Sequence, residues 1–278
     1  MQEYLLFIPP KSRRKPSQLL RELDSAGLKE GIDCSTRNKV VPCRMMLFYG
    51  WGGEQQQAAI RAHSGDYAAF DLGYWLRDGF PERKWRISMN GFHCPDRIML
   101  GPTPSDSRVK KEGIVAAPTR VRPRKKRVRN ILLIGTSLKS QRVGAAGWTA
   151  AKGREIRERF PEHRLVYRPK PMRGKESSVR FDRVSLHTPI EHELQRAELV
   201  VCRHSNVAVD ACRMGVPVVC EDGAGAAIYP KKLDDFKDQP SRELRQDFLT
   251  RLSWWQWSIN DIRAGGFWKW FRDQEDLL

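Results

Sequence analysis

The stretch from Val200 to Gly223 reads VVCRHSNVAVDACRMGVPVVCEDG. An apolar run ends in a polar corner at residues 204–206, a helix-like segment of small residues follows, and Gly215 opens a second apolar run. Two strand-like runs joined by one helix predict a strand–helix–strand unit of a parallel sheet. Ligands of open α/β sheets bind beyond the carboxyl ends of the strands, so residues 204–206 form the first candidate site.

The same alternation of apolar runs and helical segments extends over both halves of the chain. It predicts an α/β protein with two doubly wound, Rossmann-like domains, each built on a parallel sheet covered by helices. In the second half, we expect strands at 129–137, 164–171, 199–205 and 216–223, and helices at 149–161, 190–198 and 206–215. In the first half, we expect strands at 4–9, 43–50, 67–75 and 84–91, and helices at 16–27 and 52–65.

A basic segment separates the two halves. Residues 120–129 read RVRPRKKRVR, which indicates either a solvated linker or a contact to a phosphate backbone. The tail carries five of the nine tryptophans, and its apolar stripe favours packing back across the domains over a surface for stacking bases. We therefore predict an N-terminal domain at 1–118, a linker at 119–129, a second domain at 130–240 and a helical tail at 241–278.

The charge of the chain is strongly positive. Its 278 residues include 50 Lys and Arg against 33 Asp and Glu, a formal net charge of +17. This charge indicates a polyanionic partner, either nucleic acid or an anionic membrane face, although a generally basic protein that only tolerates nucleic acid has the same composition.

The cysteines and the apolar runs indicate in which cellular compartment the protein is expected. The six cysteines form no CxxC pair and no metal-type spacing with the histidines, which favours reduced core thiols in a cytoplasmic protein. No run approaches the length of a transmembrane helix, and the N-terminus resembles neither a signal peptide nor an anchor.

Polar residues follow four of the expected strands of the second half. Hydroxyls, cations and helix N–H groups at one sheet edge suit a nucleotide diphosphate. Each corner alone is weaker evidence, because Ser and Asn are also ordinary helix caps. In chain order these residues are Gly135, Thr136, Ser137, Arg168, Lys170, His204, Ser205, Asn206 and Glu221.

Several motifs resemble those of one family. RLVYRPKP and AELVVCRHSNVAVDACRMGVPVVCEDG are similar to the C-terminal half of GT-B glycosyltransferases, in particular the capsule-polysaccharide-type branch. AAFDLGYW, RISMNGFHCPD and the tail LTRLSWWQWSINDIRAGGFW resemble bacteriophage-encoded relatives of the DNA-modifying type. The resemblance covers most of the chain. It implies two domains facing across a cleft, with a nucleotide sugar held by the C-terminal domain and the acceptor by the N-terminal domain.

The resemblance also implies roles at the strand ends. Arg168 and Lys170 would neutralise the donor diphosphate as charge develops on the leaving group, unless they form a surface ion pair. Residues 204–206 would hydrogen-bond phosphate or sugar. Asp210 would bind ribose or sugar hydroxyls, unless it is a solvated helix carboxylate, and Glu221, or its neighbour Asp222, is an alternative for that role.

A GT-B enzyme also needs a base that deprotonates the acceptor hydroxyl, normally from the N-terminal domain. Asp71 is the first choice, because it ends an apolar strand and precedes Gly73. His93 and Asp96 are the runners-up. The capsule-type branch usually has Glu-Asp-Gly where residues 70–73 of this chain read FDLG. No DxD-like motif stands at a strand end, which favours metal-independent chemistry, with the nucleotide sugar as co-substrate and no cofactor.

Three functions fit these observations. The leading one is transfer of a hexose or pentose from a nucleotide sugar, UDP-sugars such as UDP-glucose being favoured, to hydroxymethylcytosine or hydroxymethyluracil in double-stranded phage DNA. A monomer in the cytoplasm of the infected host would flip the modified base to reach its hydroxyl. The alternatives are a glycosyltransferase acting on a surface or lipid-linked glycan, and a non-catalytic DNA-binding protein on a GT-B scaffold. The residues expected to contact the acceptor or DNA are Trp51, Gly52, Tyr74, Arg124, Lys125, Lys126 and Arg127.

Overall fold

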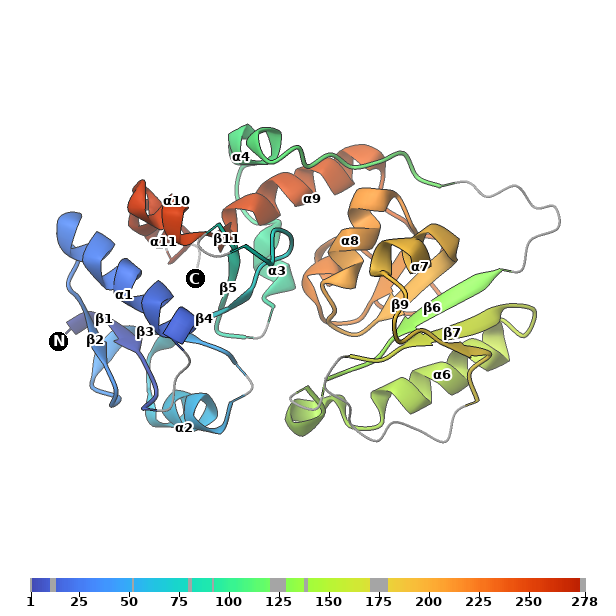
Figure 1. Cartoon of the computed structure of the whole chain (residues 1–278), viewed down its shortest axis with the longest axis horizontal. Coiled ribbons are helices and arrows are strands. Elements are labelled where there is room, and N and C mark those ends of the chain that lie inside the picture. The colour runs from blue at the N-terminus through green and yellow to red at the C-terminus, as the bar shows by residue number, and fades with distance from the viewer. Residues whose placement is uncertain are drawn as a thin grey trace. The chain divides into compact units, whose positions relative to one another are not determined.

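The structure, a computed structural model, divides into two compact units (Figure 1). It describes residues 2–10, 14–51, 53–79, 82–91, 93–120, 129–137, 140–170 and 180–275. Unit 1 comprises Met1–Cys94, Leu100–Pro102 and Leu252–Leu278, and unit 2 comprises Pro95–Met99 and Thr103–Arg251. These divisions differ from the domain boundaries expected at residues 118 and 240, because the chain enters unit 2 earlier and its last segment returns to unit 1.

Unit 1 contains a six-stranded sheet in the order β11-β5-β4-β3-β1-β2. The strands β1 (Gln2–Phe7), β2 (Cys34–Arg37), β3 (Cys43–Tyr49) and β4 (Asp66–Leu72) run parallel. β5 (Trp85–Met89) is antiparallel to β4, and β11 (Gln256–Trp257) is antiparallel to β5. The prediction of a wholly parallel sheet was wrong at β5, because the described residues between β4 and β5 form no helix, and a parallel return needs a long crossover.

Helices cover both faces of this sheet: α1 (Arg14–Lys29), α2 (Glu54–Ala62), α10 (Ile259–Arg263) and α11 (Phe267–Glu275). Successive side chains of a strand face opposite sides of the sheet, so one strand can contribute side chains to a hydrophobic core on each face. On one face, Ala59 of α2 belongs to a buried cluster with Leu5, Phe7, Met46, Phe48 and Ala69. On the other face, the ring of Tyr4 lies 4.8 Å from that of Trp268 in α11. Burial on both faces explains why these strands read as continuous apolar runs.

The tryptophan-rich tail completes unit 1. Phe267, Trp268 and Phe271 are fully buried, and the Trp268 indole N–H donates to the carbonyl of Leu23 at 3.0 Å. These contacts confirm that the tail packs against the body through its aromatic side chains.

Unit 2 contains a parallel five-stranded sheet in the order β10-β9-β6-β7-β8. The strands are β6 (Asn130–Ile134), β7 (Arg164–Arg168), β8 (Arg183–Val184), β9 (Ala197–Cys202) and β10 (Val218–Cys220). The helices are α3 (Pro95–Ile98), α4 (Ser107–Lys111), α6 (Trp148–Arg159), α7 (Ile190–Arg196), α8 (Val207–Met214) and α9 (Arg242–Trp254), which ends in unit 1. Two single turns, η1 (Gln141–Ala145) and η2 (Ala224–Ala227), follow β6 and β10.

The order of strands in unit 2 creates a switch point. From β6 the chain proceeds outward through β7 to β8, then returns to β9 on the other side of β6. α6 lies on one face of the sheet, and α7 and α8 lie on the other (Figure 1). The doubly wound α/β class predicted for this half is confirmed. In such sheets the crevice outside the switch point is the usual ligand site.

Gly215 explains how the segment quoted at the outset turns from helix to strand. It ends α8 with a left-handed φ of 70°, and a Cβ there would lie 2.1 Å from the carbonyl oxygen of Pro118. Only glycine combines this conformation with so close an approach.

Within the described part of the chain, none of the helices has the length and apolar character needed to cross a bilayer.

Candidate functional site

The candidate site of unit 2 lies at the carboxyl ends of its strands. The loops after β6 and β9 flank the switch point, and the loops after β7 and β10 adjoin them. The structure brings together predicted residues from all four loops: Ser137, Lys170, His204 and Ser205, with Asp222 from the last loop.

Lys170 and Ser205 form one part of this site. The Lys170 ammonium donates to Ser205 Oγ at 2.7 Å. Ser205 is buried, and its hydroxyl also accepts the N–H of Val207, the first residue of α8, at 3.3 Å. The Lys170 ammonium and the N-terminus of α8 therefore both contact the Ser205 hydroxyl. The N–H groups and the dipole of a helix N-terminus favour an anion.

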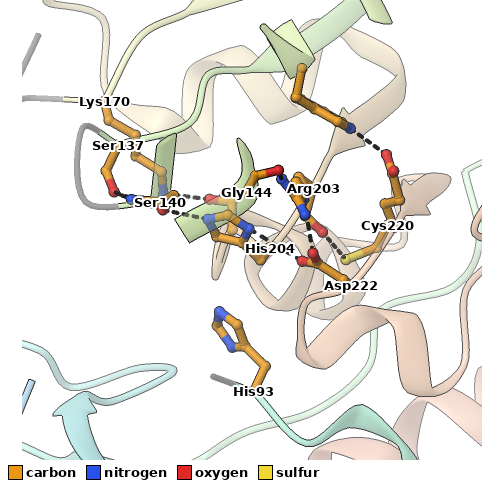
Figure 2. A network of polar contacts seen from close by, with 12 residues as sticks. His93, Ser137, Ser140, Gly144, Lys170, Arg203, His204, Cys220 and Asp222 are labelled. Atoms are coloured by element: carbon orange, nitrogen blue, oxygen red, sulfur yellow. Dashed lines mark hydrogen bonds and ion pairs between the residues drawn. The ribbon is translucent and has the colours of Figure 1, made fainter. Parts of the chain in front are cut away.

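His204 forms the other part (Figure 2). Its Nε2 lies 2.6 Å from Ser140 Oγ, and its Nδ1 lies 3.2 Å from an oxygen of Asp222. Ser140 Oγ is in turn 2.8 Å from Ser137 Oγ. Burial alone would raise the pKa of Asp222, but its contacts with His204 and Arg203 outweigh burial and lower that pKa.

Two features hold this network in place. The Arg203 guanidinium donates to Asp222 at 2.8 Å and to the carbonyl of Gly144 in η1 at 2.6 Å. It therefore links the segment after β6, which carries Ser140, to the loop after β10, which carries Asp222. A Cβ on Gly223 would lie 2.7 Å from the Cα of His204. Glycine at 223 thus lets the backbone beside Asp222 approach His204 closely enough for the carboxylate to reach the imidazole.

The remaining predicted donor residues have other contacts. Arg168 donates to Ser185 Oγ at 3.1 Å and to the carbonyl of Thr188. The indole of Trp148 donates to the carboxylate of Glu221. Their donor roles stay predictions, as do those of the residues at the same strand ends: Gly135 and Thr136, which are buried, Asn206, which precedes α8, and Asp210, in the first turn of α8.

In unit 1, the structure joins Asp71 and His93 through a residue that the sequence did not single out. Arg86, fully enclosed in β5, donates to His93 Nδ1 at 2.6 Å and to Asp71 at 3.3 Å. A guanidinium has no acceptor, so Nδ1 must accept, and the imidazole is neutral with its proton on Nε2. His93 therefore cannot take a proton at Nδ1 while this bond persists. Asp71 is half-buried and keeps an exposed side.

The other predicted acceptor residues lie in different surroundings. Tyr74 is fully buried, and burial raises the pKa of its phenol to about 12. It packs in the core of unit 1 and presents no surface to an acceptor. Trp51 is half-buried in the loop after β3, and Asp96 is exposed in unit 2, 4.0 Å from the ammonium of Lys231. The remaining four cations and one glycine lie outside the described residues: Gly52, Arg124, Lys125, Lys126 and Arg127.

Sequence reasoning missed Ser140 and Arg86. Ser140 stands three residues after Ser137, a spacing that places two hydroxyls on one side of a turn. Arg86 interrupts the apolar run WRISM and pairs in register with Asp71 across β4 and β5. A buried arginine needs an acidic or hydrogen-bonding partner. An arginine inside an apolar strand therefore could have indicated the pairing of Arg86 with Asp71.

Within the described ranges, no group of three or more His, Cys, Asp or Glu side chains is arranged to hold a metal ion.

The fold is similar to that of two solved structures from Thermosulfurimonas dismutans. One is KpsC, β-Kdo 2,4 transferase, with 13% identity, 90% of each chain covered and a TM-score of 0.51. The other is KpsC, β-Kdo 2,7 transferase, with 11% identity, 95% of this chain and 99% of that chain covered, and a TM-score of 0.52. No family model and no curated protein matches the sequence. These similarities confirm the predicted two-sheet GT-B class of fold.

Proposed function

We propose that the protein is a glycosyltransferase that moves a sugar from a nucleotide-sugar donor to an acceptor hydroxyl. The observation that carries the proposal is the constellation at the switch point of unit 2, where Lys170, Ser205 and His204 surround the start of α8. The Lys170 ammonium and the N–H groups at the start of α8 match the diphosphate of such a donor. The fold shared with two proteins named as Kdo transferases is consistent with this chemistry.

In the proposed reaction, the acceptor oxygen forms a bond to the anomeric carbon while the bond from that carbon to the phosphate oxygen breaks. The nucleotide leaves with the electron pair, and Lys170 stabilises its growing negative charge. Since the cation comes from a side chain, we expect chelators to leave the rate unchanged.

Asp71 takes the acceptor proton in this proposal. It keeps an exposed side, and its ion pair with Arg86 fixes its orientation. We prefer it to His93, because one N–H group of Arg86 donates to Nδ1 of that imidazole and occupies its lone pair.

For the acceptor, we propose the hydroxyl of a hydroxymethylated pyrimidine in duplex DNA. The net charge of +17 supports a polyanionic acceptor. A transferase acting on a surface or lipid-linked glycan is the second candidate, so an assay includes glycan acceptors beside DNA.

Donor binding tests the proposal at the site itself. We expect one of UDP-, GDP-, ADP- or CMP-sugars to raise the melting temperature of the protein. Lys170→Ala should weaken that binding roughly 10- to 100-fold, the loss expected for one charge-assisted hydrogen bond. Lys110→Ala, which removes an exposed ammonium of unit 2, is the matched control and should bind normally. A melting temperature that no nucleotide sugar moves would favour a non-catalytic DNA-binding protein.

A further inference from the structure

The hydrogen bonds around His204 have a direction that can be deduced. Asp222 has a lowered pKa and is ionised at neutral pH, so its oxygens only accept and the proton of a neutral imidazole must be on Nδ1. Nε2 then accepts from the Ser140 hydroxyl at 2.6 Å. Because Ser140 has one hydroxyl proton, the 2.8 Å contact between the two serines requires Ser137 to donate. In this state both hydroxyl protons point inward, toward His204.

Protonation of His204 reverses this chain. Nε2 becomes a donor to Ser140 Oγ, and the Ser140 proton no longer needs to point at the imidazole. One of the two serines still donates to the other, so the hydroxyl proton of the second serine becomes available to an anion, and the site gains one positive charge. An anion therefore binds the protonated state better than the neutral state.

We infer that Ser140 and Asp222 are positioning residues of the donor site, and that a nucleoside diphosphate sugar binds there together with a proton taken up by His204. This inference rests on the proposed function. The proton comes from solvent and ends on Nε2. Asp222 holds Nδ1–H in both states, so the added proton has only Nε2 to occupy.

The charged groups around His204 allow this assignment. Asp222, from the β10 loop, faces Nδ1, and Arg203 from the same loop as His204 pairs with Asp222. The Lys170 ammonium, from the end of β7, contacts Ser205. Beneath the loops, the buried thiols of Cys202 and Cys220 lie on paired strands and form no disulfide. Cys220 Sγ donates to the carbonyl of Arg203 at 3.5 Å, and the hydrogen bond between the two thiols lowers the pKa of Cys202. Among these groups, His204 is the one imidazole, the side-chain type that exchanges protons with solvent near neutral pH.

Isothermal titration with UDP-glucose tests the inference, because the diphosphate of this probe gains no proton near neutral pH. The binding enthalpy is measured in two buffers of different ionisation enthalpy, which reports proton uptake. We expect uptake of up to about one proton and a dissociation constant that rises up to about tenfold between pH 7 and pH 8.

Variants separate the inference from simple structural damage. His204→Gln and Asp222→Asn should bind UDP-glucose more weakly, without proton uptake and without the pH dependence, while melting near the wild-type temperature. Ser140→Ala should retain uptake at His204 but bind more weakly, since one hydroxyl donor is lost. Asp238→Asn, which removes an exposed carboxylate elsewhere in unit 2, should behave as wild type.

Three results would count against the inference. Binding of UDP-glucose with no proton uptake overturns it and leaves the proposed function intact. Uptake that persists in His204→Gln also overturns it, because another group then titrates. Absence of binding by UDP-glucose and by the other nucleotide sugars overturns both the inference and the donor site.

Discussion

Asp71 is the residue on which the chemistry of the proposed transfer depends most. Asp71→Asn keeps the shape and a hydrogen bond to Arg86 but removes the proton acceptor. We expect the rate of sugar transfer to fall by about 10²- to 10⁴-fold, the usual contribution of a general base, with donor affinity unchanged. Asp66→Asn, an exposed carboxylate at the start of the same strand, is the control. If Asp71→Asn transfers sugar at the wild-type rate, the base lies elsewhere.

At the same scale, the sequence indicates which residue types stand at strand ends but not how they pair. His204, Ser205 and Lys170 could be named because each follows an apolar run. The partnership of Ser140 with His204 joins residues 64 positions apart, and the orientation of Asp222 depends on the close approach at Gly223. Tyr74 was expected at the acceptor, but a tyrosine next to a strand end is also a good core residue, and here it is buried.

Among the elements of unit 2, helix α7 is tied to the sheet by a buried carboxylate. Glu193 accepts hydrogen bonds from Arg183 of β8 and from Ser185, both at 2.7 Å. Burial alone would raise the pKa of Glu193, but these bonds lower it from 4.5 to about 2. Because the folded pKa lies below the unfolded one, this group stabilises the fold above pH 4.5, and the stabilisation is lost as pH falls toward about 2.

Glu193→Gln should therefore lower the free energy of unfolding by roughly 3 kcal/mol at neutral pH, and by much less near pH 2. Urea unfolding at several pH values measures this difference. Glu191→Gln, an exposed position on the same helix, should change stability by under about 0.5 kcal/mol. A constant difference between Glu193→Gln and wild type at all pH values would contradict the lowered pKa, because it requires the same pKa of Glu193 in the folded and unfolded states.

Helix α11 stabilises unit 1 through its aromatic face. Trp268 is fully buried, and its N–H is bonded to the backbone of α1. Trp268→Ala should cost about 3–5 kcal/mol, since it leaves a large cavity. Lys269→Ala, one position along but exposed, should be close to neutral. Thermal unfolding of the two variants decides whether the tail is integral to unit 1, and equal melting temperatures would contradict that view.

The elements themselves were largely predictable. Continuous apolar runs located β3, β4, β6, β7, β9 and β10 near their observed bounds, because strands buried on both faces have this pattern. The antiparallel direction of β5 was not predictable from its own residues. It depends on the segment that connects β4 to β5, which has no helix among its described residues. β2 was missed because CSTR is short and mostly polar, and β11 because its two residues sit within a helical tail.

At the scale of the whole molecule, the net charge of +17 implies salt-dependent binding to polyanions. We expect affinity for duplex DNA to fall by about 10³-fold or more between about 50 and 200 mM salt, as counterions are displaced from several phosphates. Replacing Arg124, Lys125, Lys126 and Arg127 by alanine should reduce the slope of log affinity against log salt. An affinity that salt leaves unchanged would argue against DNA and for a neutral glycan acceptor.

The most direct test of the central claim is mass spectrometry of acceptors incubated with the protein and a panel of UDP-, GDP-, ADP- and CMP-sugars. The acceptors are duplex DNA containing hydroxymethylcytosine or hydroxymethyluracil, and a set of glycans. We predict that one donor adds a hexose or pentose to the hydroxymethylated nucleoside, and that Lys170→Ala and Asp71→Asn lose this product. Transfer to a glycan and not to DNA would show that the acceptor is a glycan and that the proposed DNA acceptor is wrong. No product on any acceptor would contradict the claim that the protein is a glycosyltransferase.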